Sequence, residues 1–303
     1  MIAPPRVLEA GDRTLELGPR PLLMGIVNAS PDSFSDGGLH AGLAAQIRLA
    51  EQLLAGGAEV IDVGGESAST GRAPVEPEEE AGRVVPLVRG IVEQLGAVVS
   101  VDTYKPAVAR AAIAAGASIV NDVSGLRDPD LARVCADTGA ALVLMHTAAP
   151  PRVRRQEPDL YGDVVGEVLG FLRERIEQAV ALGVRREQLI VDPGPDFAKT
   201  PAQTIRLLAE VGRLHELGRP VLMAISRKDF IGALTGRSPR ERLGGTLAAL
   251  AHGLEHGAHV FRVHDVAPAA DFITVRAALR EGADVGEDLA LREEIRYDRS
   301  SWA

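Results

Sequence analysis

Polar side chains that can bind a charged small molecule recur along this chain, each directly after a short apolar run. They comprise carboxylates, amides, histidines and basic groups: Asn28, Asp62 with Glu66, Asp102, Asn121, His146, Asp192, Ser226 with Lys228, and Arg262 with His264. An amphipathic stretch follows each of them. A single pocket lined by such groups would have the features of an active site, so the pattern indicates an enzyme.

The apolar runs predict parallel strands, because they are rich in Val, Leu and Ile and lack the alternation of a half-exposed strand. They cover residues 22–27, 60–63, 98–101, 119–121, 142–145, 189–191, 221–224 and 260–263. The stretches between them predict helices over residues 41–55, 78–94, 106–115, 130–138, 164–182, 202–217, 239–256 and 268–279.

This alternation predicts a (β/α)₈ TIM barrel with an N-terminal β-hairpin. An open doubly wound sheet is the competing fold, but eight units of near-equal length favour closure. In a closed barrel the strand-end residues would all face one mouth. Residues 6–17, within the segment 1–19, predict the hairpin, with a turn at Gly11-Asp12 that could close the bottom of the barrel.

The composition is that of one acidic domain. No linker divides residues 1–303, and residues 281–303 are expected to form an extension, either a further helix or a mobile end. The net charge of −9 argues against nucleic acid as the main partner. Cys135 stands alone, which excludes an internal disulfide and suits a reducing cytoplasm. We find no signal sequence or membrane-spanning apolar run and expect no membrane contact.

Asp102, Asn121 and Asp192 could bind a nitrogen heterocycle. A carboxylate has two acceptor oxygens that match a guanidine-like edge with two N–H groups, and an amide both donates and accepts. Each residue alone could equally cap the helix that follows it. Three of them at strand ends favour a ligand.

Two pairs of polar residues predict a phosphate site. Ser226 with Lys228, and Arg262 with His264, are spaced two apart and should point to one side of their strands. The loops after the seventh and eighth barrel strands frequently hold phosphate. Residues 28–38 are rich in oxygen ligands of the kind that Mg²⁺ prefers, although a Gly/Ser turn explains that composition equally well.

Three long connections, residues 28–40, 64–77 and 147–161, lie on the expected mouth side. Their length predicts lids or binding loops, with plain insertions as the alternative.

Taken together, these segments resemble dihydropteroate synthase, in order from about residue 20 to residue 280. The matching pieces are Met24-Gly-Ile-Val-Asn28-Ala-Ser-Pro-Asp-Ser-Phe-Ser-Asp-Gly-Gly38, Ile61-Asp-Val-Gly-Gly-Glu-Ser67, Ser100-Val-Asp-Thr-Tyr104, Asn121-Asp-Val-Ser-Gly125, Leu144-Met-His146, Asp192-Pro-Gly194, Ser226-Arg-Lys228 and Arg262-Val-His-Asp-Val266.

The resemblance implies condensation of (7,8-dihydropterin-6-yl)methyl diphosphate with 4-aminobenzoate, which releases diphosphate. It assigns the pterin to Asp102, Asn121, Met145, Asp192 and Lys228, of which Asp102, Asp192 and Lys228 would be catalytic. It assigns the diphosphate to Arg262 and His264, and its Mg²⁺ to Asn28. It assigns the 4-aminobenzoate to Phe197 and Ser226. A homodimer is expected on general grounds.

The chain departs from the family pattern at two points. Residues Ala68-Ser69-Thr70-Gly71, followed by Arg72, replace a typical Thr-Arg-Pro-Gly, and Pro195-Asp196-Phe197-Ala198-Lys199 replaces a Gly-Phe-Gly-Lys run. Asp196 adds a negative charge where a benzoate would approach. The alternatives are therefore a divergent pterin-binding homologue with little or no synthase activity, and a methyltransferase domain that uses methyltetrahydrofolate.

Overall fold

Eight parallel strands form the centre of the computed structural model, which describes residues 6–18, 20–29, 38–66, 74–281 and 289–291. The strands run in the order β8-β7-β6-β5-β4-β3-β10-β9, and a bridge between Val191 and Val221 joins the two ends of the sheet. Their bounds are β3 Leu22–Asn28, β4 Val60–Gly64, β5 Val98–Asp102, β6 Ile119–Asp122, β7 Ala141–Met145, β8 Leu189–Asp192, β9 Leu222–Met223 and β10 Val260–Val263. The predicted barrel is confirmed.

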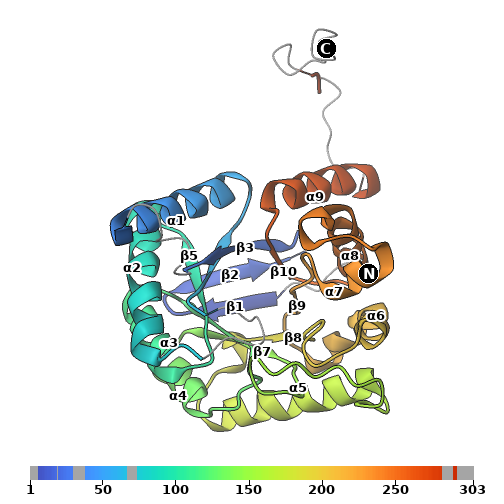
Figure 1. Cartoon of the computed structure of the whole chain (residues 1–303), viewed down its shortest axis with the longest axis horizontal. Helices are drawn as coiled ribbons and strands as arrows, with labels where there is room; N and C mark the ends of the chain where they lie inside the picture. The colour runs from blue at the N-terminus through green and yellow to red at the C-terminus, as the bar shows by residue number, and fades with distance from the viewer. Residues whose placement is uncertain (1–5, 19, 30–37, 67–73, 282–288, 292–303) are drawn as a thin grey trace.

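Helices form a ring around these strands (Figure 1). Their bounds are α1 Gly38–Ala55, α2 Pro77–Leu95, α3 Pro106–Ala114, α4 Asp130–Thr138, α5 Val164–Ala181, α6 Pro201–Ala209, α7 Asp229–Thr235, α8 Leu243–Glu255 and α9 Val266–Glu281. In the part of the chain that the structure describes, no helix has the length and apolar character needed to cross a membrane.

The helices differ from the prediction at three places. The helix expected over residues 202–217 is α6 followed by a 3₁₀ helix, Val211–Leu217, and the one expected over 239–256 begins as a 3₁₀ turn, Pro239–Glu241. Helix α7 was not predicted, because it spans only seven residues and ends at the left-handed Gly236 (φ 70°). So short a helix has no distinct apolar period.

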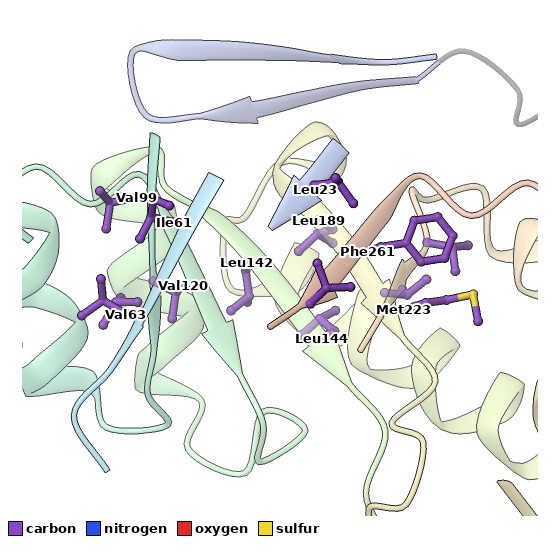
Figure 2. Close-up of a cluster of buried hydrophobic side chains, with 14 of the residues drawn as sticks. Leu23, Ile61, Val63, Val99, Val120, Leu142, Leu144, Leu189, Met223 and Phe261 are labelled. Atoms are coloured by element: carbon purple, nitrogen blue, oxygen red, sulfur yellow. The ribbon is translucent and has the colours of Figure 1, made fainter. Parts of the chain in front are cut away.

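Each barrel strand has two apolar faces with different partners. The outward side chains pack against the surrounding helices, as Ile61, Val99, Leu142 and Phe261 do in Figure 2. The inward side chains near the strand starts form a separate apolar layer, which includes Val60, Ile119, Val143, Ile190 and Val260. Because both faces are apolar, the strands read as continuous hydrophobic runs in the sequence.

The N-terminal hairpin covers this inner layer at the start of the barrel. Strands β1 (Arg6–Ala10) and β2 (Arg13–Leu17) are joined by a two-residue turn in which Gly11 has φ 66°. Leu8, Ala10 and Leu17 are buried against the inner layer. The Gly11 N–H donates to the Gly139 carbonyl at 2.9 Å, which ties the turn to the end of α4. The hairpin therefore closes the barrel bottom, as predicted.

We expect Leu8→Ala to lower the free energy of unfolding by about 2–4 kcal/mol, because it removes a fully buried side chain and leaves a cavity. Urea unfolding followed by circular dichroism measures the change. Val7→Ala, on the same strand but 50% exposed, is the matched control and should cost less than about 0.5 kcal/mol. Equal losses for the two variants would mean that the hairpin does not seal the barrel.

Candidate active site

A cavity of about 440 Å³ lies at the carboxyl ends of the barrel strands, and every residue that the resemblance assigned to a substrate or to Mg²⁺ lines it. Those residues come from seven different strand ends or the loops after them: Asn28, Asp102, Asn121, Met145, Asp192, Phe197, Ser226, Lys228, Arg262 and His264. The sequence reasoning also placed Glu66 at this mouth, and it lines the same cavity. Nothing in this arrangement by itself assigns a ligand to each residue.

The register of the sheet explains why these side chains meet. Asn28 pairs with Gly64, Gly64 with Asp102, and Asp102 with Asn121, so one row crosses four adjacent strands. Inward side chains recur every second residue. Two residues past the apolar inner layer, the inward positions are therefore polar, as Asn121 follows Ile119 and Asp192 follows Ile190.

Arg262 joins two carboxylates at the centre of the cavity floor. Its Nε donates to Asp62 Oδ2 at 2.6 Å, and its Nη2 donates to Asp102 Oδ2 at 2.8 Å. Burial, opposed by Arg262 and assisted by the nearby Asp62, raises the pKa of Asp102 to about 7. Asp102 does not cap α3, whose N-cap is Lys105. The helix-cap alternative for Asp102 is therefore wrong.

Asp192 is held by a sharp backbone turn. Its Oδ1 accepts from the Gly194 N–H at 2.7 Å, and Gly194 has φ 65°. A Cβ at that glycine would lie 2.0 Å from the His146 carbonyl oxygen, so only glycine fits. Burial raises the pKa of Asp192 and lowers the pKa of Lys228, whose ammonium lies 4.5 Å from the Phe197 ring centre.

Ser226 and His264 contact each other at the mouth. They lie in the segments that follow the neighbouring strands β9 and β10. The Ser226 hydroxyl lies 3.0 Å from His264 Nδ1 and accepts from the His264 N–H at 3.2 Å. Partial desolvation, together with the cationic Arg227 and Arg262, lowers the pKa of His264 to about 4. His264 is therefore neutral at pH 7.

His146 does not line the cavity, so its prediction as a mouth residue is wrong. It follows the inward Met145 by one position and therefore points away from the barrel interior. Its Nδ1 lies 2.8 Å from Nζ of Lys199, a fully buried lysine that also donates to the Gly194 and Phe197 carbonyls at 2.9 and 3.1 Å. Burial lowers the pKa of Lys199 to about 7. Nothing in the residues around Lys199 indicates that this lysine is buried.

Comparison with known proteins identifies the family. A model of the pterin binding enzyme family matches residues 24–264. A dihydropteroate synthase of Synechocystis is 40% identical over 277 residues, which is 91% of this chain and 96% of that protein. The Escherichia coli enzyme is 38% identical over 278 residues, or 92% and 95% of the two chains. The chain belongs to the dihydropteroate synthase family.

Solved structures of dihydropteroate synthases share the same fold. The Xanthomonas albilineans enzyme with 4-aminobenzoic acid superposes with a TM-score of 0.83 at 44% identity, covering 91% of this chain and 98% of that one. The same enzyme in complex with 7,8-dihydropteroate gives a TM-score of 0.80 at 44% identity, covering 90% and 98%. The similarity extends over the barrel and its mouth.

The loop after β8 keeps a glycine-like backbone although it lacks the family glycines. Asp196 and Ala198 have φ of 67° and 48°, a left-handed conformation that non-glycine residues rarely adopt. The Asp196 carboxylate accepts from the Thr204 hydroxyl at 3.1 Å and from the Asp229 N–H at 2.5 Å. The negative charge that the sequence analysis counted against benzoate binding is therefore engaged by protein donors.

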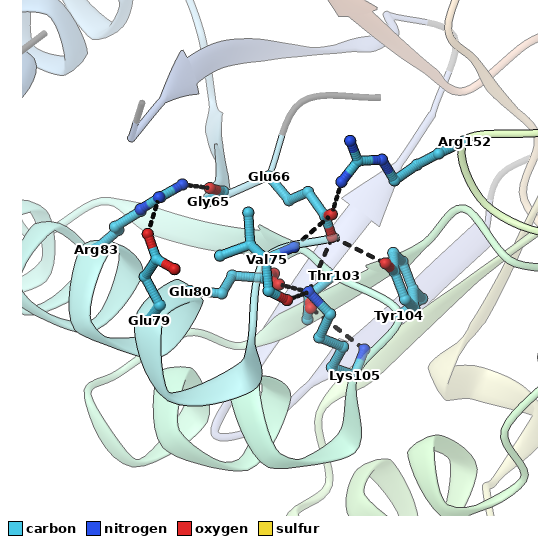
Figure 3. Close-up of polar contacts among 10 residues, drawn as sticks. All are labelled: Gly65, Glu66, Val75, Glu79, Glu80, Arg83, Thr103, Tyr104, Lys105 and Arg152. Atoms are coloured by element: carbon cyan, nitrogen blue, oxygen red, sulfur yellow. Dashed lines mark hydrogen bonds and ion pairs between the residues drawn. The ribbon is translucent and has the colours of Figure 1, made fainter. Parts of the chain in front are cut away.

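The loop after β4 contributes Glu66, which is surrounded by donors from two other connections (Figure 3). Tyr104 and Lys105 come from the connection after β5, and Arg152 comes from the connection after β7. Sequence reasoning missed all three, since nothing in their spacing indicates a common partner. Two predicted features, the oxygen-rich residues 30–37 and the altered residues 68–72, lie outside the described residues.

We expect Arg262→Met to lower the free energy of unfolding by about 3 kcal/mol at pH 8, because the fully buried Asp62 and the 20% exposed Asp102 would be left as unpaired charges. The loss should be smaller at pH 5. Arg262 lowers the pKa of Asp102, so its removal raises that pKa further, and at pH 5 the folded variant holds a proton on Asp102. Urea unfolding at the two pH values measures both effects.

The matched control is Arg227→Met, because Arg227 makes a two-bond pair with Asp265 at the same mouth, with the two side chains 31% and 25% exposed. It should cost less than about 1 kcal/mol. A pH-independent loss for Arg262→Met would contradict the proposed charge repulsion.

Proposed function

We propose that this chain is a dihydropteroate synthase, a transferase of folate biosynthesis that binds the pterin diphosphate in the 440 Å³ cavity. The observation that carries the proposal is the convergence of the predicted pterin and diphosphate residues on that one cavity. Relatives of about the same length that are 38–40% identical are dihydropteroate synthases.

The pterin ring would bind between the two buried carboxylates. Asp102 and Asp192 accept from its guanidine-like N–H groups, Asn121 reads the ring edge, and Lys228 donates to a ring acceptor. Met145, whose side chain lines the cavity, packs against the face of the ring. These fixed groups orient the methylene carbon toward the second substrate.

The reaction breaks the bond between the methylene carbon and the diphosphate oxygen. The electron pair leaves with the diphosphate, close to Arg262 and His264, and the methylene carbon becomes cationic. Asp102 and Asp192 stabilise that positive charge as preorganised anions in a site of low polarity. The amine nitrogen of 4-aminobenzoate then forms the new carbon–nitrogen bond and loses a proton.

Mg²⁺ fits the oxygen donors at the mouth as an ion carried by the substrate. Asn28 offers one side-chain oxygen, and the described ranges contain no group of three or more acidic, histidine or cysteine side chains arranged to hold a metal. An ion with one protein ligand takes the others from water and phosphate. Asn28 would hold this ion, which would neutralise charge on the leaving diphosphate.

The 4-aminobenzoate would enter from a second cavity of about 320 Å³, which shares Val123, Phe197 and Lys228 with the first. Phe197 lies between the two spaces and would pack against the aromatic ring, with Ser226 nearby in the first cavity. We further propose that the protein is cytoplasmic, in keeping with the single cysteine, Cys135. We also propose that it forms a homodimer, on general grounds.

The divergent-homologue alternative is not favoured, because relatives that are 38–40% identical over more than nine-tenths of this chain are dihydropteroate synthases, and so is a solved structure with 7,8-dihydropteroate bound. The loop after β8 presents Phe197 in a backbone suited to the family glycines, and Asp196 is engaged by Thr204 and Asp229. The methyltransferase alternative supplies no diphosphate for Arg262 and His264 to bind.

The purified protein with the pterin diphosphate, 4-aminobenzoate and Mg²⁺ should release diphosphate and form 7,8-dihydropteroate in equal amounts. A coupled diphosphate assay and chromatography of the product measure the two. Complementation of a synthase-deficient bacterial strain is the test in cells. Pterin binding without turnover in either test would reject the synthase proposal in favour of the divergent homologue.

We expect Asp102→Asn and Asp192→Asn to weaken pterin binding by about 1–3 kcal/mol at pH 8, because each leaves a ring N–H opposite an amide donor. In the unaltered protein, affinity should rise about tenfold from pH 6 to pH 8 as Asp102 ionises near pH 7. Calorimetry at several pH values measures both. If Asp102→Asn keeps the pH dependence, then another group titrates.

Asn28→Ala should raise the Mg²⁺ concentration needed for half-maximal binding of the pterin diphosphate about tenfold, through the loss of one ligand oxygen. Binding measured by calorimetry during a Mg²⁺ titration gives this value. Asn28→Asp keeps an oxygen at the position and should not raise it. An unchanged Mg²⁺ requirement in the alanine variant would remove Asn28 from the metal site.

A further inference from the structure

Glu66 is the centre of a buried charge network at the edge of the mouth (Figure 3). Its carboxylate accepts from the Val75 N–H at 3.1 Å, the Tyr104 hydroxyl at 2.9 Å, Lys105 Nζ at 2.8 Å, and Arg152 Nη1. Burial alone would raise the pKa of Glu66, but the hydrogen bonds from Lys105, Val75 and Tyr104 outweigh it and lower the pKa. Glu66 is therefore an anion that depends on these donors.

The network balances its charges. Lys105 also binds the buried Glu80 and donates to the Val75 carbonyl at 2.7 Å. Two cations, Lys105 and Arg152, thus face two anions, Glu66 and Glu80. The side chains of Arg152 and Glu66 are only 9% and 7% exposed, so solvent screens their attraction weakly. Loss of either cation leaves the network with an excess negative charge in a buried place.

Arg152 reaches Glu66 from a distant connection, 86 residues along the chain. Its backbone is left-handed, with φ 67°, a conformation that non-glycine residues rarely adopt. A residue holds such a conformation only where its surroundings fix it. The contact to Glu66 is one such constraint on the connection after β7.

Arg152 lies on the side of the site from which the second substrate, 4-aminobenzoate, would enter. It lines the 320 Å³ cavity and a small space of about 30 Å³ that it shares with Glu66 and Phe197. The residues that line the pterin cavity include Glu66 and Phe197 but not Arg152. A change at Arg152 therefore acts first on the wall of the second cavity.

We propose that Arg152 is a positioning residue for the arylamine substrate, which acts by fixing Glu66 and with it the wall between the two cavities. This inference rests on the proposed function. Its substrate class is an aromatic amine with a carboxylate, which must pass this wall to reach the methylene carbon.

Two neighbouring arginines provide matched controls. Arg154 and Arg155 lie on the same connection and line the same cavity, but their side chains bond within that connection, to Gln156 at 2.8 Å and to Glu157 at 3.2 Å. They carry the same charge as Arg152 without reaching Glu66. They separate a positioning effect from general attraction of the benzoate anion.

Arg152→Met should raise the KM for 4-aminobenzoate about tenfold, since a buried charged hydrogen bond is lost. The kcat value and the pterin affinity should stay within about twofold, as should every parameter of Arg154→Met and Arg155→Met. Glu66→Gln combined with Arg152→Met should raise the KM no more than the more severe single change, because the two residues act through one contact.

Three results would overturn the inference. An equal rise in KM for Arg154→Met or Arg155→Met would indicate general charge attraction. Multiplied effects in the double variant would show that Arg152 and Glu66 act independently. A fall in kcat and melting temperature with an unchanged KM would indicate a purely structural role.

Calorimetric binding of 4-aminobenzoate in the presence of diphosphate and Mg²⁺ tests the same inference without turnover. Weaker binding to Arg152→Met, but not to the two control variants, supports it even if the unaltered protein proves inactive. Equal binding to the unaltered protein and Arg152→Met overturns it. Absence of turnover in the unaltered protein bears on the proposed function alone.

Discussion

The rest of the site depends on one guanidinium group that holds two carboxylates inside the barrel, one of them fully buried and the other 20% exposed. Arg262 lies 200 residues from Asp62 and 160 from Asp102, yet it bonds both at 2.6 and 2.8 Å. Asp62 is fully buried, and two carboxylates at such depth would repel each other without a cation between them. The pair fixes β10 relative to β4 and β5. It also lets a polar layer sit directly on the apolar layer that the hairpin seals.

The same rule governs the rest of the mouth, where buried charges face opposite charges from other strands. Asp192 lies near the cations Lys228 and Lys199, whose fields oppose the rise in its pKa, and Glu66 lies among Lys105 and Arg152. Such groups are held in place before any substrate arrives. A charged substrate then meets fixed dipoles and charges rather than water, which is how a preorganised site stabilises a transition state.

The sequence predicts most of the barrel and the lining of the site, because both follow from the alternation of side-chain direction along a strand, which repeats every two residues. Asp102 and Arg262 end apolar runs, and their inward direction follows from the strand positions before them. The same rule directs His146 outward, since it comes one residue after the inward Met145, and the prediction of His146 as a mouth residue did not follow it. Side-chain partners that lie far apart in the chain could not be predicted from the sequence. Nothing in the spacing of Lys199 or Arg152 indicates a partner 53 or 86 residues away. Short helices such as α7 have too few residues to show the period of apolar residues that indicates a helix.

The loop after β8 shows how residues other than glycine can hold a backbone conformation that glycine favours. Asp196 and Ala198 stand in left-handed conformations, which cost a non-glycine residue about 1–2 kcal/mol each. Lys199 offsets this cost by bonding the Gly194 and Phe197 carbonyls from a fully buried position, and Asp196 is tied to Thr204. The backbone path is therefore imposed by contacts at both ends of the loop. Phe197 keeps its place between the two cavities because the lysine holds the loop, whether or not glycines flank it.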